Sequence, residues 1–202
     1  MRWVLALWFW IGAASADPIV VFAAASLKDP LDSLTQGTDV VVSYAGSGTI
    51  ARQVIQGAPA DVVLVANAQW MAEIQKNVAA ENVADFASNT LVLIAPAGAD
   101  PINLEQGLAA QLQDGPLALG FTTAVPAGIY AREALTVLGL WGDVSGKVAE
   151  VDNVRAVVAL VARGEAPLGI VYETDVIGRD TIDVVARFPR QRIRKFDTWA
   201  GL

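Results

Sequence analysis

The stretch from Val40 to Val65 constrains the fold most, because it predicts a strand, a turn, a helix and a second strand in direct succession. Val40 to Val42 form a β-branched run without polar alternation, which is typical of a strand buried on both faces in a parallel sheet. The small residues Gly46 to Thr49 favour a helix start. A Gly/Pro loop ends that helix before the apolar strand Val62 to Val65. We therefore predict a βαβ unit and an α/β fold.

The polar turn of this unit lies at the carboxyl end of its first strand, where open α/β sheets bind their ligands. Ser47 is a candidate anion ligand there, since free N–H groups at a helix start attract negative charge. Similar strand-to-helix exits are predicted at Ser26, Ala127 and Val154. Each helix N-terminus stabilises an anion by about 0.3–1 kcal/mol, so four converging starts would form a site for a compact anion. For each serine alone, an ordinary helix cap is the simpler interpretation.

Further strands and helices continue the pattern on both sides of the central unit. Apolar runs predict strands over residues 19–23, 91–94, 117–121 and 167–172. Helical periodicity predicts helices over residues 69–75, 129–138 and 154–163. Pro96-Ala97-Gly98 is the candidate crossover between two lobes. Tyr172 ends a buried strand at the same sheet edge as the serines and therefore joins the candidate ligands.

Other polar and aromatic residues near these positions have simpler interpretations. Arg52, Arg132 and Arg155 lie about one turn into predicted helices, where solvated faces or pairs between lobes are favoured over contact with a ligand. The aromatic side chains of Trp70, Trp141 and Tyr130 are interpreted as packing.

The composition excludes several function classes. With 54% apolar and 17% charged residues in 202, the chain has ample material for a core. The net charge is −7, and −8 without Arg2, which disfavours nucleic acids and anionic membrane surfaces as partners. Histidine and cysteine are both absent. This absence removes disulfides, an N-terminal lipidated cysteine, the commonest general base and the commonest zinc ligand.

Residues 1–16 have the pattern of a secretory signal peptide. Arg2 precedes the apolar run Trp3 to Ala14, and Ala14-Ser15-Ala16 matches a cleavage site. The apolar run is shorter than the ~20 residues needed to span a bilayer. We therefore expect cleavage before Asp17, a soluble extracytoplasmic product and no membrane insertion after cleavage.

Five stretches resemble the periplasmic molybdate-binding proteins of ABC transporters, which have the type II periplasmic binding protein fold. The stretches begin at Val21, Tyr44, Val125, Gly139 and Asn153, and read VFAAASLKD, YAGSGTIARQVIQGAPADV, VPAGIYAREAL, GLW and NVRAVVALVARGEAPLGIVY. They cover most of the chain from Val21 to about Asp175. The ordered pair VPAGIYA and GEAPLGIVY is quite specific, whereas AAASL is shared more widely among solute-binding relatives.

The resemblance implies two α/β lobes joined by a hinge, with an interlobe cleft that closes over molybdate or tungstate. Lobe one would comprise residues 17–94 and 182–202, and lobe two residues 95–181. The implied oxyanion ligands, which contact oxygen and not the metal atom, are the hydroxyls and amides of Ser26 and Ser47, the amides of Ala127 and Val154, and the hydroxyl of Tyr172. We expect a periplasmic monomer that is not an enzyme, needs no cofactor and delivers its oxyanion to an ABC permease.

The sequence departs from the family pattern at two places. Val65-Ala66-Asn67 stands where similar proteins commonly have Ser-Ala-Asp, which removes an acid near the lobe edge. The family also continues beyond the return strand near Val184 with C-terminal helices that pack on lobe one, whereas this sequence ends at Leu202. We therefore expect a shortened lobe one.

Three alternatives remain open from the sequence. The ligand could be another tetrahedral oxyanion such as sulfate. Gly46-Ser47-Gly48 is a near miss to the G-x-S-x-G motif of serine hydrolases, but no histidine exists to activate the serine; esterase turnover lost in Ser47→Ala would support this alternative. A ligand-sensing regulatory domain has the same fold, and cytoplasmic retention of the protein would support it.

Overall fold

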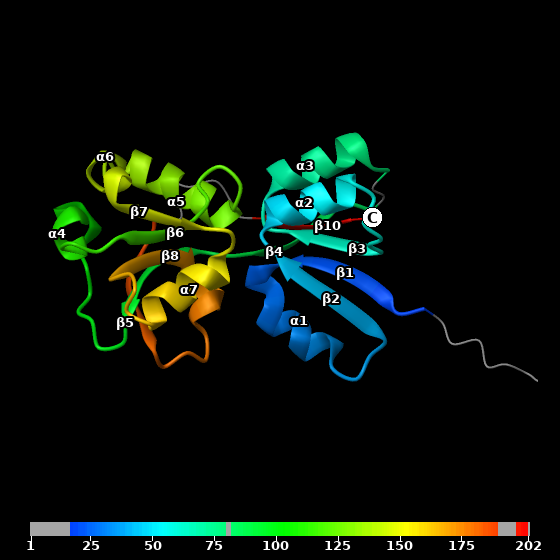
Figure 1. The fold of residues 1–202 in the computed structure, drawn as a ribbon, viewed down its shortest axis with the longest axis horizontal. Helices are drawn as coiled ribbons and strands as arrows, with labels where there is room; N and C mark the ends of the chain where they lie inside the picture. Colours follow the sequence, from blue (N-terminus) through cyan, green and yellow to red (C-terminus); the bar gives the residue numbers. More distant parts are fainter. Residues whose placement is uncertain (1–16, 80–81, 190–196, 202) are drawn as a thin grey trace, which may run out of the picture.

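Two five-stranded sheets divide the chain into two lobes that lie side by side (Figure 1). The computed structural model describes residues 17–79, 82–189 and the backbone of 197–201. The predicted signal peptide, residues 1–16, and the basic segment Arg190 to Lys195 lie outside these residues. Lobe one is the first sheet with the helices packed on it, and lobe two is the second sheet with its helices. The predicted two-lobe α/β fold is confirmed.

In lobe one, the central strand β1 pairs in parallel with β2 on one side and β3 on the other. Helices α2 and α3 cover one face of the sheet and α1 covers the other (Figure 1). Ile50, Val54, Met71 and Ile74 bury the α2 and α3 side against Val63. The strands, in sheet order, are β2 (Val40–Ala45), β1 (Ile19–Ala24), β3 (Val62–Val65), β10 (Asp197–Gly201) and β4 (Ala84–Ser88). The helices are η1 (Ala25–Leu27), α1 (Lys28–Thr35), α2 (Ser47–Ile55) and α3 (Ala68–Asn77).

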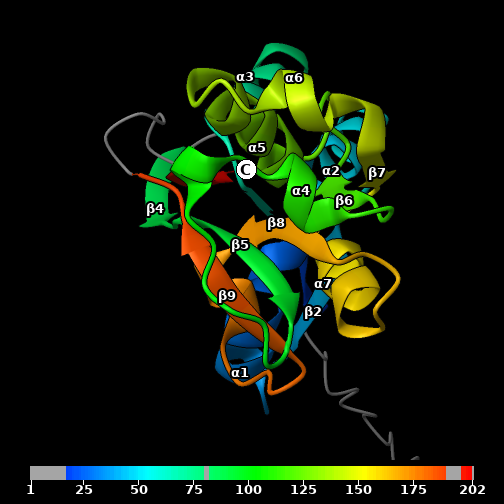
Figure 2. The same cartoon turned by 90° about the vertical axis from the view of Figure 1, so that its left-hand side faces the viewer.

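In lobe two, β6 pairs in parallel with β7 and β8, while β5 pairs antiparallel with β8 and β9. The helices α5 and α7 pack on opposite faces of this sheet (Figures 1 and 2). In sheet order, the strands are β7 (Val148–Val151), β6 (Leu117–Gly120), β8 (Leu168–Tyr172), β5 (Leu91–Pro96) and β9 (Ile182–Arg187). The helices are η2 (Leu104–Gln106), α4 (Ala109–Leu112), α5 (Pro126–Val137), α6 (Trp141–Val144), η3 (Ser145–Lys147), α7 (Val154–Ala162) and η4 (Glu173–Val176). Within the described ranges, no helix combines the length and apolar character needed to cross a membrane.

The central βαβ unit forms as predicted, but its first strand is not buried on both faces. Strand β2 lies at the edge of the sheet, with β1 between it and β3. Val40 and Val42 pack towards α1, whereas Val41, on the other face of this edge strand, is 55% exposed. The β-branched run predicted the strand correctly, but it could not show that the strand lies at the edge of the sheet, where a helix covers only one of its faces.

The predicted lobe boundaries are wrong at both ends of lobe two. Residues 91–94 and 182–187 were assigned to lobe one, but strands β5 and β9 both belong to the second sheet. The chain crosses between lobes at Asn89-Thr90, between β4 and β5, and not at Pro96-Ala97-Gly98. Gly98 instead takes a positive φ in a turn that follows β5. The apolar run of β5 is buried on both faces because α5 and α7 pack on opposite sides of the sheet at this central strand.

Gly128, in the first turn of α5, allows this helix to pack directly on the end of β6. A Cβ atom at Gly128 would collide with the backbone carbonyl of Gly120. We predict that Gly128→Ala lowers the free energy of unfolding by about 1–3 kcal/mol, since the helix must shift away from the strand. Urea denaturation of the purified protein measures this change.

Gly142→Ala is the matched control, because Gly142 also lies in a helix and a Cβ there meets no atom within 4 Å. This substitution should be neutral or stabilise by about 0.5–1 kcal/mol. Equal effects of the two substitutions would contradict the packing argument.

Candidate functional site

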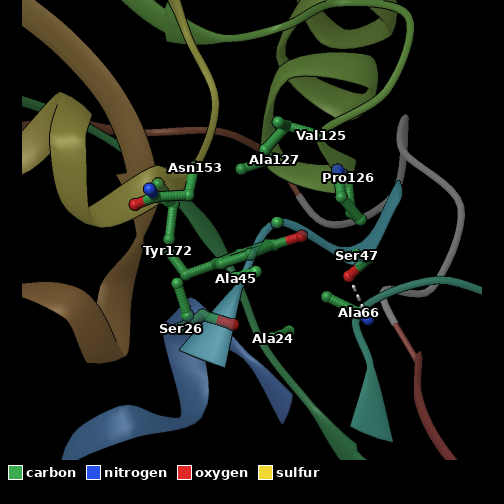
Figure 3. Close-up of a pocket in the computed structure, with 13 residues that line it drawn as sticks. Ala24, Ser26, Ala45, Ser47, Ala66, Val125, Pro126, Ala127, Asn153 and Tyr172 are labelled. Carbon is green, nitrogen blue, oxygen red and sulfur yellow. Dashed lines mark hydrogen bonds between the residues drawn. The ribbon is translucent and has the colours of Figure 1, made fainter. Parts of the chain in front are cut away.

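The carboxyl ends of parallel strands from both lobes face each other across one small cavity (Figure 3). Lobe one contributes the residues that follow β1, β2 and β3, and lobe two those that follow β6 and β7 together with the end of β8. The structure brings all five predicted ligand positions, Ser26, Ser47, Ala127, Val154 and Tyr172, to this cavity. The lining is completed by Ala24, Ala25, Ala45, Gly46, Ala66, Val125, Pro126 and Asn153.

Ser47 is the first residue of α2 and is 1% exposed. Its hydroxyl oxygen accepts a hydrogen bond of 3.0 Å from the amide of Ala66, at the end of β3. Because this amide occupies a lone pair of the oxygen, the hydroxyl hydrogen remains available to donate elsewhere. Ser47 therefore has the chemistry of a donor to an anion. It is not the N-cap residue, which is Gly46.

Ser26 lies in the segment that follows β1, whereas Ser47 follows β2. The Ser26 side chain is 7% exposed. It is the second residue of the 3-10 helix η1, which precedes α1. Ser26 is not a helix cap, since no side chain caps η1 or α1. Asp29 points to arginines of lobe two. The short 3-10 turn carries Ser26 into the cavity lining.

Lobe two presents helix N-termini at Ala127 and Val154. Pro126 occupies the first position of α5, and Ala127 follows it. Asn153 caps α7, and its side-chain oxygen accepts a hydrogen bond of 3.0 Å from the amide of Ala156. The first amides of an α-helix have no acceptor within the helix. The amides of Ala127 and Val154 are therefore placed to donate to a guest in the cavity.

Tyr172 ends β8 and is 3% exposed. Figure 3 shows its ring extending across the cavity, with the hydroxyl on the side of Ser47. Burial raises the pKa of the Tyr172 hydroxyl well above its usual range. The hydroxyl is therefore protonated at neutral pH and acts as a neutral donor.

Asp175 lies behind Tyr172 and is fully buried. Its carboxylate accepts a hydrogen bond of 3.2 Å from the Tyr172 amide. Burial raises the pKa of Asp175 to about 7, while the nearby charge of Arg155 opposes this shift. Asp175 is not among the residues predicted from the sequence, although its spacing of three residues from Tyr172 is that of a local side-chain-to-backbone hydrogen bond.

The size and charge of the cavity restrict its guest. Its volume is about 10 Å³, close to the minimum that holds one water molecule. A tetrahedral oxyanion is larger than this space, so such a guest would hold the lobes slightly further apart, and larger molecules would separate them more. Among the residues that the structure describes, none that lines the cavity carries a formal charge. In the same part of the chain, no group of acidic residues is arranged to hold a bare metal ion. The arrangement suits a compact guest that accepts hydrogen bonds.

Contacts between the lobes surround the cavity. Trp70 of α3 donates a hydrogen bond of 2.8 Å from its indole nitrogen to the carbonyl of Ala124 in lobe two. Its interpretation as packing alone was therefore incomplete, and its sequence context contained no signal for this bond. A side chain at Gly46 would collide with the carbonyl of Asp152. Glycine at this position permits the close approach of the two lobes.

The three arginines discussed above do not line the cavity. Arg52 is exposed and bonds Thr49 of its own helix, and exposed Arg132 lies over the ring of Trp141. Arg155 forms an ion pair of 2.8 Å with Asp29 of lobe one. The interpretation of these arginines as solvated groups or interlobe pairs is confirmed.

Comparison with known proteins gives consistent matches. The family model of bacterial extracellular solute-binding proteins matches residues 19–196. The molybdate-binding protein ModA of Escherichia coli is 40% identical over 200 residues, which cover 92% of this chain and 78% of that protein. The periplasmic molybdate-binding protein of Azotobacter vinelandii superposes with a TM-score of 0.79 at 21% identity, over 90% of this chain and 84% of that one. The sulfate-binding protein SubI of Mycobacterium tuberculosis gives 0.65 at 14% identity, over 93% and 76%. At these identities, the two superpositions establish a shared fold alone.

The buried carboxyl of Asp175 predicts a specific pH dependence. Because its pKa is raised to about 7 in the folded protein, the folded state binds a proton more readily than the unfolded state between about pH 4 and pH 7. The free energy of unfolding should therefore decrease as the pH rises through this range, by roughly 1 kcal/mol per unit. Above pH 7 this contribution should be constant.

Urea denaturation at pH 5, 6, 7 and 8 measures the effect. The variant Asp175→Asn has no titrating group at this position and should lose this decrease. Asp143→Asn, at an exposed aspartate of α6, should keep the slope of the parent protein. Parallel curves for the parent protein and Asp175→Asn would contradict the assignment.

Proposed function

Because the chain belongs to the family of bacterial extracellular solute-binding proteins, we propose that it binds molybdate and delivers it to an ABC permease. The observation that carries this proposal is the convergence of Ser26, Ser47, Ala127, Val154 and Tyr172, from both lobes, on one small uncharged cavity. The 40% identical Escherichia coli relative, named as a molybdate-binding protein, supports molybdate as the anion. Both that relative and the family model are named for binding, and the chain is a binding protein and not an enzyme.

The chemistry of the donors favours a fully ionised tetrahedral anion. Molybdate is a dianion at neutral pH, with four acceptor oxygens and no proton to donate. Hydroxyls and amides supply donors to all sides of such a guest, whereas a protonated anion such as hydrogen phosphate would also need an acceptor. Helix N-termini supply the balancing positive potential, each the equivalent of about half a charge. No arginine or lysine is needed in direct contact.

Binding is coupled to closure of the lobes in this proposal. Ser26 and Ser47 belong to lobe one, whereas Ala127, Val154 and Tyr172 belong to lobe two. The anion completes its hydrogen bonds only when the lobes meet, so it stabilises the closed arrangement. The crossover at Asn89-Thr90, which connects β4 of lobe one to β5 of lobe two, is a candidate hinge for this closure. The protein acts as a monomer in the periplasm, and its closed form is the one that a permease receives.

Tungstate and sulfate distinguish the size argument from the charge argument. Tungstate has nearly the size of molybdate and should bind similarly. Sulfate has the same charge but is smaller, so a cavity shaped for molybdate leaves some of its hydrogen bonds long. Sulfate remains the second candidate ligand, because it is also a tetrahedral dianion with four acceptor oxygens and no proton to donate.

Calorimetry of the purified protein tests the proposal with molybdate, tungstate, sulfate and phosphate. We expect molybdate and tungstate to bind with dissociation constants within about threefold of each other, and sulfate to bind at least ~100-fold more weakly, a difference of about 3 kcal/mol. If sulfate competes equally with molybdate, the size argument fails. If none of the four anions binds, the proposed function fails.

Ser47→Ala tests the lining itself. Removal of this hydroxyl takes away one donor to the dianion and the acceptor for the Ala66 amide. The affinity for molybdate should fall by roughly 10- to 100-fold, as expected for a hydrogen bond to a charged group. Ser145→Ala is the control, since Ser145 lies outside the cavity and bonds only the nearby Gly142 carbonyl among the bonds described for it. Unchanged affinity in Ser47→Ala would remove Ser47 from the site.

A further inference from the structure

Arg155 connects the two lobes just outside the cavity. It is the second residue of α7, directly after Val154, and its side chain is 15% exposed. Its Nε donates to the carbonyl of Ala25 in lobe one at 3.2 Å, and its Nη1 donates to the Asp29 carboxylate, also in lobe one, at 2.8 Å. One guanidinium from lobe two therefore holds two points of the segment that carries Ser26.

The same guanidinium also contacts the segment that carries Tyr172. Its Nε lies 3.0 Å from Oδ1 of Asp175. Since the single Nε hydrogen is donated to Ala25, this contact is an ion pair and not a hydrogen bond. The other oxygen of Asp175 accepts from the amide of Tyr172. Arg155 is thereby linked to three of the five candidate ligand segments, those of Ser26, Val154 and Tyr172.

A second arginine supports the same cluster. Arg179 donates from Nε to the carbonyl of Asp175 at 2.8 Å, and its Nη2 lies 3.4 Å from the Asp29 carboxylate. The cluster brings two arginines, Arg155 and Arg179, together with the carboxyl groups of Asp29 and Asp175. Only Asp29 comes from lobe one. Separation of the lobes would therefore break both contacts to Asp29 while those between Asp175 and the arginines can persist.

We propose that Arg155 is a positioning residue that latches the closed form, so that it slows release of the anion without touching it. This inference rests on the proposed function for its ligand, but the contacts themselves do not. A latch made after the lobes meet stabilises the closed complex and should act on the dissociation rate more than on the association rate. A planar guanidinium serves here because it reaches the Ala25 carbonyl and the Asp29 carboxylate simultaneously, which an ammonium group cannot do in the same geometry.

Stopped-flow measurements with molybdate test the latch, with the fluorescence change on binding as the signal. Trp70 lies at the lobe interface through its bond to Ala124 and should contribute to this signal. In Arg155→Met the dissociation rate should rise by roughly 10-fold or more, while the association rate changes by less than about 3-fold. Arg155→Lys should give an intermediate dissociation rate, because lysine keeps the positive charge but lacks the planar set of N–H donors that a guanidinium presents.

Arg163→Met is the matched control. Arg163 lies at the C-terminal cap of α7 and pairs with Glu165 within lobe two, where both side chains are more than half exposed. Loss of this arginine changes the net charge equally but removes no contact to lobe one. Its dissociation rate should equal that of the parent protein. An equal rise in Arg163→Met and Arg155→Met would overturn the latch.

Asp29→Asn separates the latch from a general loss of stability. Asp29 is half exposed, and Arg155 keeps its contact with Asp175 after this substitution, so folding should not be impaired. It should raise the dissociation rate by several-fold. The double variant with Arg155→Met should be slower than the product of the two single effects predicts, because only the longer Arg179 contact to Asp29 is then left for Asp29→Asn to remove. Additive effects, or no effect of Asp29→Asn, would show that the two residues do not act together.

Small-angle scattering of the protein without added anion distinguishes failure of the latch from failure of the proposed function. If the parent protein binds none of the four anions, the proposed function is wrong. The latch then still predicts a larger radius of gyration for Arg155→Met than for Arg163→Met, because the lobes separate more often. Equal radii in that case would overturn the latch as well.

Discussion

The candidate site depends on bringing backbone and hydroxyl donors from two sheets to within reach of one small volume while keeping formal charges out of it. A buried charge costs several kcal/mol unless it is paired, whereas helix amides carry partial positive charge that the fold already orients. Gly46 and Gly128 make this convergence sterically possible, one by admitting the opposite lobe and the other by seating α5 on its strand. The geometry of the cavity therefore follows from close backbone packing more than from any single side chain.

The charged groups near the site lie one layer outside the cavity. Arg155 and Asp175 contact each other behind Val154 and Tyr172, and Asp29 joins them from the opposite lobe. This separation lets neutral donors recognise the guest while ionic contacts hold the lobes. The two layers are connected through the backbone, since Asp175 bonds the Tyr172 amide and Arg155 bonds the carbonyl that precedes Ser26.

Local sequence patterns predicted much of this arrangement. The strand ends and the helix starts at Ser47 and Val154 were identifiable, because glycine, proline and asparagine have strong local preferences. The resemblance to a known family then implied that these positions, together with Ser26, Ala127 and Tyr172, bind an oxyanion. The edge position of β2, the membership of β5 and β9 in the second sheet, and the hydrogen bond of Trp70 to Ala124 were not predictable in this way. Each depends on neighbours that are distant in sequence.

The sequence by itself determined the α/β class, the polar turns at strand ends and a donor set without histidine or cysteine, since these depend on residue type and local backbone preference. Only the tertiary structure decided that five positions between Ser26 and Tyr172 line one cavity. It also decided which strands belong to each lobe, and that Asp175 is buried beside Arg155. The physical reason is that strand pairing, burial and contacts between the lobes join segments that are far apart in the chain. The conformational preferences of neighbouring residues do not determine which of these segments meet.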